Sequence, residues 1–291
     1  MKKVFYILII LLGWKGFSQT LNPYLQSATS NSIYVNWKTS SNTESIVEFG
    51  SSPTELTNTA TGTTQILSDV GYPNNYYYHT VKITGLEPNT KYYYKTKTGL
   101  LTSEVLSFRT MPLPGEAATA DGRSRFLVMG DNQMINLPRF DTLVSQAKRN
   151  IAQKWGENLD PSDNIVLTVM VGDQVDVGTL NHYEFVHFDK NKALSGLLPT
   201  QTLVGNHETY GTLGMQAYYD HFVLDEMSYN GISSGTENYY ANQVGNVLFI
   251  CLDTEHTGAQ QLAWVIQVIN AANDDSTVDW IVSLGHRPYQ A

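Results

Sequence analysis

Polar side chains that could bind a metal follow four predicted strands of this sequence, and each comes directly after a glycine. The four pairs are Gly130-Asp131, Gly172-Asp173, Gly205-Asn206 and Gly285-His286. A glycine allows the sharp turn by which the end of a strand presents its next side chain at the edge of a sheet. Ligands of open α/β sheets bind at the carboxyl ends of the strands. Two carboxylates, an amide oxygen and an imidazole are suitable ligands for a divalent cation, so the sequence predicts a metal site at this edge.

Each of these signals has a simpler interpretation when it is considered alone. A single Gly-Asp pair is usually an ordinary turn, and a lone histidine such as His286 is more often a residue of the core or of a sheet edge. The run Gly205-Asn206-His207-Glu208 is much less common, and it follows a buried strand. The four groups together, in this order and on different strands, favour the metal site.

Apolar runs before these groups, and helical stretches between them, indicate how the site is positioned. The predicted strands cover residues 125–129, 165–171, 200–204, 247–252 and 280–284, and the predicted helices cover 140–155 and 260–272. Strands that alternate with helices are typical of an α/β fold. Residues 124–291 are therefore predicted to form an α/β domain with a layered β-sheet.

Residues 19–112 have a different pattern, rich in Ser, Thr, Asn and Tyr. Short runs of alternating polar and apolar residues are separated by turn residues, which is typical of an all-β sandwich. The turn at Pro88, the tyrosine that follows it at position 92, and Trp37 on an early strand resemble a fibronectin type III domain. Residues 113–123 contain proline and glycine and predict a linker between the two domains.

The first 18 residues have the three parts of a secretory signal peptide. Lys2 and Lys3 precede an apolar stretch at 4–14, and the small residues Gly16 and Ser18 follow with one residue between them. We expect cleavage after Ser18 and a secreted, periplasmic or cell-surface protein. An N-terminal membrane anchor is the alternative interpretation, although the apolar stretch is short for a bilayer.

The charge and the cysteine content exclude several classes of protein. The formal net charge is −9, and the acidic excess lies in the second domain because residues 19–112 contain six acidic and six basic residues. This acidity disfavours nucleic acid, and disfavours a membrane once the signal is removed. The single cysteine, Cys251, excludes a disulfide framework and a cysteine-based zinc cluster.

The order Gly-Asp, Gly-Asp-x-x-Asp, Gly-Asn-His-Glu and strand-His resembles the calcineurin-like metallophosphoesterases. Three features resemble the purple acid phosphatase branch: the preceding β domain, its opening at 22–26, and the run Leu252-Asp253-Thr254-Glu255. The resemblance extends over essentially all of the chain after the signal. It implies two divalent metal ions, of which Fe, Mn, Zn and Ca are the candidates, and hydrolysis of a phosphate ester by a metal-bridging hydroxide.

The same resemblance implies a role for each site residue. Asp131 would bind the first metal, Asp173 would bridge both, and the second metal would be bound by Asn206 and His286. His207 would be the catalytic residue that faces the leaving group and donates a proton to it. Two further residues are candidate contacts for the substrate, namely Glu208 and Arg287.

This sequence departs from the family pattern at three places. Asp176 stands where purple acid phosphatases have the tyrosine that binds ferric iron, so we expect no Fe(III)-tyrosinate. Gln133 stands where other metallophosphoesterases have a histidine, and its amide oxygen is a further candidate ligand. The closing Gly-His-x-His motif does not follow His286, which predicts that the C-terminal part of the domain, with the last strands of its sheet, is missing.

The sequence therefore predicts a secreted metal-dependent phosphoesterase of the acid phosphatase type. A phosphodiesterase remains an alternative because the loops carry no readable substrate code. A second alternative is a non-catalytic surface protein, in which the β domain contacts a surface partner or a glycan and the phosphoesterase domain has decayed. The presence of Asp131, Asp173, Asn206, His207 and His286 favours the enzyme, because decay would erode these residues as readily as any others.

Overall fold

The computed structural model describes residues 22–40, 44–72, 76–119, 121–133, 139–155, 160–224 and 226–288. The predicted signal peptide, residues 1–18, lies outside these ranges. Within them, no helix combines the length and the apolar character that crossing a bilayer would require.

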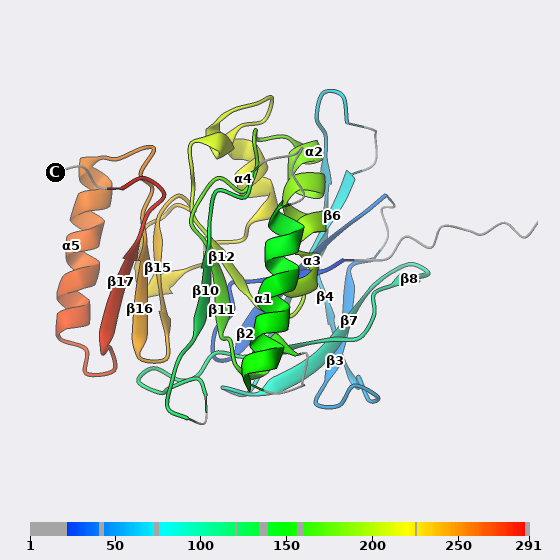
Figure 1. The fold of residues 1–291 in the computed structure, drawn as a ribbon, viewed down its shortest axis with the longest axis horizontal. Coiled ribbons are helices and arrows are strands. Elements are labelled where there is room, and N and C mark those ends of the chain that lie inside the picture. The colour runs from blue at the N-terminus through cyan, green and yellow to red at the C-terminus, as the bar shows by residue number, and fades with distance from the viewer. Residues whose placement is uncertain are drawn as a thin grey trace, which may run out of the picture.

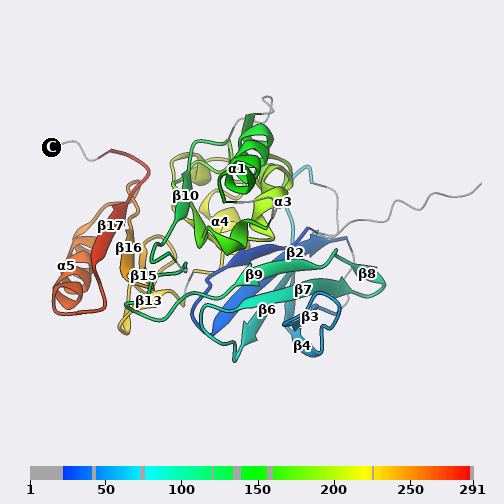
Figure 2. The same cartoon turned by 60° about the horizontal axis from the view of Figure 1, so that its bottom comes forward.

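The N-terminal part is an antiparallel β-sandwich, as the alternating pattern predicts. One of its sheets contains β1 (Tyr24–Gln26), β2 (Ser32–Thr39), β6 (Tyr76–Thr84) and β5 (Thr63–Leu67); the other contains β4 (Asn58–Thr61), β3 (Ile46–Gly50), β7 (Lys91–Thr98), β8 (Leu101–Thr102) and β9 (Leu106–Arg109). Trp37 lies fully buried between them and donates a hydrogen bond from Nε1 to Thr98 Oγ1 (2.8 Å). Figure 2 shows this sandwich packed along one side of the helices of the second domain.

The second domain is an α/β unit built on two small sheets. The first contains the parallel strands β10 (Phe126–Met129), β11 (Leu167–Met170) and β12 (Thr200–Thr202), and the second contains β15 (Tyr240–Val244), β16 (Val247–Cys251) and β17 (Trp280–Leu284). A short hairpin precedes the second sheet, with strands β13 (Ser228–Tyr229) and β14 (Ile232–Ser233). The two sheets meet face to face, where Phe126 and Phe249 pack edge-to-face at 4.8 Å.

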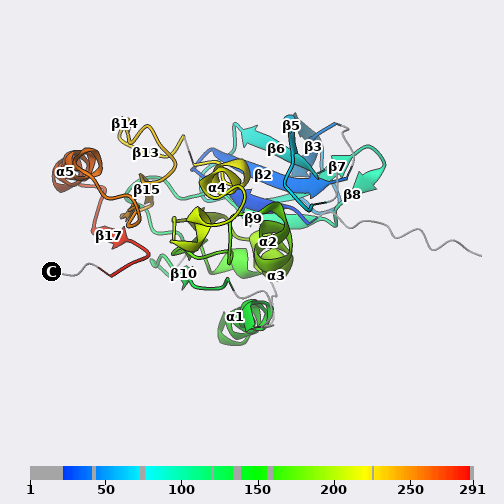
Figure 3. The same cartoon turned by 90° about the horizontal axis from the view of Figure 1, so that it is seen from above.

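Two long helices and several short ones accompany these sheets in the described part of the chain. They are α1 (Arg139–Trp155), α2 (Leu180–His182), α3 (Asp189–Ser195), α4 (Met215–His221) and α5 (Ala259–Asn273), together with the short η1 (Pro161–Asp163), η3 (His207–Thr209) and the π-helix η2 (Tyr183–Phe188). Both long helices lie within one residue of the predicted bounds. The α1 helix buries Phe140, Val144 and Ile151, and Trp264 and Val268 of α5 pack against the β15–β17 sheet. Figure 3 shows α5 beside β17.

A strand pair joins the two domains into one continuous sheet. β1 of the sandwich pairs in parallel with β12 of the α/β domain, with Gln26 opposite Thr200. The resulting sheet has the order β10-β11-β12-β1-β2-β6-β5, and it runs through the middle of the molecule in Figure 1. A single hydrophobic cluster contains Trp37 of the sandwich as well as Val169 and Phe249 of the α/β domain. The two units therefore fold against one another through a shared sheet and core.

Candidate metal centre

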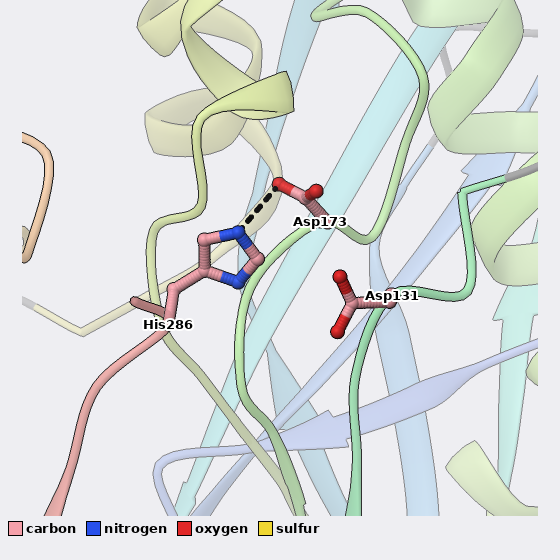
Figure 4. A group of neighbouring side chains, drawn as sticks. All are labelled: Asp131, Asp173 and His286. Carbon is pink, nitrogen blue, oxygen red and sulfur yellow. Dashed lines mark ion pairs between the residues drawn. The ribbon is translucent and has the colours of Figure 1, made fainter. Parts of the chain in front are cut away.

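Three strand ends bring potential metal ligands together. Asp131 follows β10, Asp173 follows the neighbouring parallel strand β11, and His286 follows β17. One ligand atom from each of these residues lies within 4.8 Å of the others, and Figure 4 shows the three side chains approaching from separate strand ends. The ends of two strands of the first sheet and of one strand of the second thus bring together residues that lie far apart in the sequence.

The turns that present the two aspartates require unusual backbone geometry. Asp131 and Asp173 have positive φ angles of 52° and 55°, and Gly172 has a φ of 89°. A Cβ on Gly172 would lie 2.7 Å from ring atoms of His286. Glycine at position 172 therefore allows both the left-handed turn and the close approach of the imidazole.

Asp173 lies at the centre of the cluster and is 3% exposed. Its Oδ1 accepts a hydrogen bond from the backbone N–H of His207 (3.0 Å) and lies 3.3 Å from His286 Nε2. Its Oδ2 accepts from the side-chain amide of Gln133 (3.1 Å). The two oxygens face different neighbours, which is the arrangement that lets one carboxylate contact two cations.

The ring of His286 is oriented by the backbone. Its Nδ1 donates to the carbonyl oxygen of Val171 (2.9 Å), so the neutral ring carries its lone pair on Nε2. That Nε2 lies 3.2 Å from Asn206 Oδ1 as well as near Asp173 Oδ1. When the ring is neutral, three electron-pair donors face one another here, which is the arrangement that a bound cation would stabilise.

Two amide oxygens near this cluster lack a hydrogen-bond partner. Gln133 Oε1 and Asn132 Oδ1 are buried without a donor among the described residues, while the nitrogen of Asn132 donates to the carbonyl oxygen of Gln174 (3.0 Å). A buried polar atom without a partner is costly. These two amide oxygens, like the carboxylates and the imidazole, are ligand types that bind hard or borderline divalent cations.

His207 is placed next to the cluster but is held by different contacts. Its Nδ1 donates to the carbonyl oxygen of Asp176 (2.7 Å), which directs Nε2 toward the site, 3.8 Å from Asp173 Oδ2. Tyr210 packs against its ring at 5.4 Å and is 48% exposed. Tyr210 also accepts a weak hydrogen bond from the amide nitrogen of Asn206 (3.4 Å). Tyr210 could not be recognised from the sequence, because an isolated aromatic residue on a loop has no distinctive spacing.

Glu208 is buried beneath the site, where it does not suit the predicted role of a substrate contact. Its sequence context predicts a contact with the substrate, but the residue is fully buried. Its Oε2 accepts from the backbone N–H groups of Gly205 (2.7 Å) and Asp173 (2.9 Å), and its Oε1 accepts from that of Gln174 (2.7 Å). Burial raises the pKa of Glu208 to about 7, against the lowering effect of these three hydrogen bonds. The carboxylate lies beneath the site and connects the turns that carry Asp173 and Asn206, so a direct contact with substrate is not supported.

Arg287, the other predicted substrate contact, lies at the surface beside His286. Its Nε donates to Glu255 Oε1 (2.7 Å), and its backbone N–H donates to Thr254 Oγ1 (3.0 Å). An open groove of about 600 Å³ adjoins it, lined by Leu252, Thr254, Thr257, Ser283, Gly285, Arg287 and Pro288. A guanidinium at this rim is accessible to an anionic group.

Asp176 does not join the metal cluster. Its carboxylate Oδ2 lies 3.5 Å from His182 Nδ1, and its backbone oxygen is the acceptor for His207. The aspartate that stands in place of the family's tyrosine is therefore directed toward the π-helix side of the site.

Comparisons with known proteins agree with this architecture. The pattern of a family described as "Purple acid Phosphatase, N-terminal domain" matches residues 19–110, and that of "Calcineurin-like phosphoesterase" matches residues 124–290. Purple acid phosphatase 23 of Arabidopsis thaliana is 26% identical, in a match that covers 72% of this chain and 48% of the relative. Purple acid phosphatase 15 of the same plant is 24% identical, in a match that covers 90% of this chain and 55% of the relative.

Two solved structures have the same fold. Purple acid phosphatase PPD1 from yellow lupin (Lupinus luteus) seeds superposes with a TM-score of 0.68 at 20% identity, covering 91% of this chain and 50% of that one. A structure of PhoD superposes with a TM-score of 0.60 at 16% identity, covering 90% and 61%. The chain spans about half the length of the curated relatives that it matches.

Proposed function

Because the chain belongs to the calcineurin-like phosphoesterase family, with a purple acid phosphatase N-terminal domain before it, we propose that it is a metal-dependent phosphoesterase of the acid phosphatase type. The observation that carries this proposal is the convergence of Asp131, Asp173 and His286, whose ligand atoms lie within 4.8 Å of one another. The substrates of the proposed reaction are phosphate esters.

Four or five side chains would hold the metals. Asp131, Asp173, Asn206 and His286 supply the ligand atoms, and the unpartnered oxygen of Gln133 is a further donor. A pair of divalent cations, when bound, neutralises charge on the phosphoryl group and lowers the pKa of a water molecule. We propose a site without tyrosinate iron, since position 176 is aspartate, and therefore a protein without the purple colour of that centre.

His207 is the proposed general acid. Its Nδ1 is already used in the hydrogen bond to the Asp176 backbone, and its Nε2 faces the site. A proton held on Nε2 is in position to pass to the oxygen of the departing alcohol, which would otherwise leave as an alkoxide. Arg287, at the rim of the adjoining groove, is a proposed contact for the anionic part of the substrate.

The metal dependence is tested with the Asp173→Asn variant. Asparagine keeps the size of the side chain but removes the negative charge between two cations, so we expect loss of at least one metal and of nearly all hydrolysis of p-nitrophenyl phosphate. The matched control is Asp279→Asn, an exposed aspartate whose carboxylate contacts Asn246. Metal analysis and turnover are measured for both variants. Two retained metals with normal turnover in Asp173→Asn would contradict the proposal.

The role of His207 is tested by comparing two leaving groups. General acid help is worth about 10²–10⁴-fold and matters most for a poor leaving group. His207→Ala should therefore retain both metals, and should slow hydrolysis of an alkyl phosphate more than that of p-nitrophenyl phosphate. The measured quantities are the two kcat values and the metal content. Equal slowing of both substrates with loss of metal would instead make His207 a ligand.

A further inference from the structure

One carboxylate of the β-sandwich reaches across to two loops of the candidate site. Asp69, between β5 and β6, accepts a hydrogen bond from Thr212 Oγ1 on its Oδ1 (2.6 Å) and from the backbone N–H of Leu180 on its Oδ2 (3.1 Å). The turn that carries Asp69 is closed by its own bond from Tyr72 N–H to the Asp69 carbonyl oxygen (3.3 Å). The two oxygens of a single side chain thus bind the segments around Leu180 and Thr212, which are far apart in the sequence of the α/β domain.

These two segments are fastened to each other by Gly178. Its N–H donates to the carbonyl oxygen of Tyr210 (2.6 Å), and its own carbonyl oxygen accepts from the N–H groups of Leu213 and Gly214 (3.1 Å each). A Cβ at position 178 would lie 2.4 Å from the carbonyl oxygen of Gly214. Residues 176–180 and 210–214 are therefore packed backbone to backbone, and a displacement of one displaces the other.

The fastened segments determine the orientation of His207. The carbonyl oxygen of Asp176, at the start of the first segment, is the acceptor for His207 Nδ1 (2.7 Å). The second segment begins at Tyr210, whose backbone N–H donates to the carbonyl oxygen of His207 (3.3 Å) and whose ring packs on the imidazole. The two segments that contact His207 are therefore the same two segments that hydrogen-bond to the carboxylate of Asp69.

We propose that Asp69 is a positioning residue, by which the β-sandwich domain holds the 176–180 and 210–214 loops together and so aims His207 at the leaving group. The first half of this proposal concerns the loops alone. The second half, the effect on the leaving group, rests on the proposed phosphoesterase function.

Two variants remove the contact in different ways. Asp69→Asn keeps the shape but removes the charge and one of the two acceptor oxygens. Thr212→Val removes the hydroxyl donor at the other side of the contact. The matched control is Glu226→Gln, because Glu226 is also a carboxylate that connects the domains, through Tyr34 and Lys82 near the opposite end of β6.

Hydrogen exchange tests the loops without any need for activity. In the full-length protein, we expect Asp69→Asn to speed amide exchange in residues 176–182 and 207–214 by about 10-fold or more, since hydrogen bonds to charged groups are among the stronger ones. Thr212→Val should have a smaller effect in the same residues. Exchange in β16 should remain unchanged, and Glu226→Gln should leave the two loops as in the wild type.

The leaving-group comparison tests the connection to His207. Asp69→Asn should lower kcat for an alkyl phosphate more than for p-nitrophenyl phosphate, with KM little changed. In a His207→Ala background, Asp69→Asn should cause no further loss on the alkyl substrate, because the two residues act through the same proton transfer.

Unchanged exchange in both loops of Asp69→Asn would overturn the proposal, as would faster exchange throughout the protein. Equal slowing of both substrates, or a further loss in the His207→Ala background, would overturn the connection to His207. If the wild type hydrolyses neither substrate at any metal concentration, the proposed function fails, while the exchange data still decide whether Asp69 holds the loops.

Discussion

Two residues of this site have backbone conformations that residues other than glycine rarely adopt. Asp131 and Asp173 both lie in the left-handed region, and each such residue costs of the order of 1 kcal/mol or more. The cost is offset by specific contacts, because the N–H of Asp173 donates to the buried carboxylate of Glu208 and the N–H of Asp131 donates to the carbonyl oxygen of Gly172. Strain of this kind is common where a site must present two charges at one point.

Gly172 offers a test of how this geometry supports the metal ligands. Gly172→Ala would force a methyl group into the space next to the ring of His286, where the Cβ would lie 2.7 Å from it. We expect lower stability, because the φ of 89° disfavours alanine, and in addition metal affinity at least about 10-fold weaker, because the ring must move. The measurements are urea unfolding and titration with Mn²⁺ or Zn²⁺.

The control for this variant is Gly85→Ala. Gly85 has a similar φ of 73°, but no atom lies within 4 Å of the position of its Cβ. It should show the loss of stability without the loss of metal affinity. If the two alanine variants bound metal equally well, the close contact with His286 would have no part in holding the cation.

At the scale of the helices and strands, the parts with strong periodicity were predictable from the sequence. The helices α1 and α5 were predicted within one residue at each end because their apolar residues recur every three to four positions. The fold class of both domains is confirmed, since alternation and turn residues are local signals. Asp131 and Asp173 lie together because the parallel strands β10 and β11 end on the same side, whereas His286 reaches them from β17 of the second sheet, which the prediction of a single sheet edge did not include.

Other features had no local signal. The pairing of β1 with β12 depends on tertiary packing, and a three-residue strand has too few residues to specify its partner. The burial of Glu208 could not be inferred from its place after His207, because its partners are backbone amides of two separate turns. The contact between Asp69 and Leu180 joins two loops without any pattern in either.

The strand β6 carries a buried histidine that should make stability depend on pH. The ring of His79 stacks on Trp37 at 5.0 Å, and among the described residues its nitrogens contact the hydroxyl groups of Thr39 and Ser45 (2.8 Å each) and of Thr64 (3.1 Å). Burial lowers the pKa of His79 to about 4. The unfolded chain binds the proton near pH 6.5, so the folded form is favoured above that pH and loses stability as the pH falls toward 4.

We expect His79 to account for about 2 kcal/mol of the stability lost between pH 7.5 and pH 5. His187 and His221 are also buried, with pKa values lowered to about 3 and about 4, and contribute with the same sign. The contribution of His79 is therefore the difference in pH dependence between the wild type and His79→Gln, measured by urea unfolding at both pH values. Identical pH dependence in the two proteins would show that His79 is not held neutral in the folded state.

At the scale of the whole molecule, the β-sandwich is a structural part of the phosphoesterase unit. The shared seven-stranded sheet and the common core join the two, and polar contacts reinforce the junction. Lys38 pairs with Glu184 (2.7 Å), and Lys91 pairs with Asp163 (2.9 Å). Because of this interface, we expect substitutions in the sandwich, such as those at Asp69, to alter the candidate metal site.

The last prediction concerns where this assembled protein resides, and we propose that it is exported. The basic Lys2 and Lys3, the apolar stretch at 4–14 and the small residue at Ser18 together have the pattern that a signal peptidase reads. We therefore expect the exported protein to begin at Gln19. The measurement is N-terminal sequencing of the exported fraction after expression of the full chain.

The control is Ile9→Lys, which places a charge in the middle of the apolar stretch and should leave the chain uncleaved inside the cell. An intact Met1 in the exported fraction would exclude cleavage. An uncleaved chain that sediments with membranes would show that the segment acts as a membrane anchor. Because the apolar stretch is short for a bilayer, its flanking lysines would then have to hold it at the membrane surface.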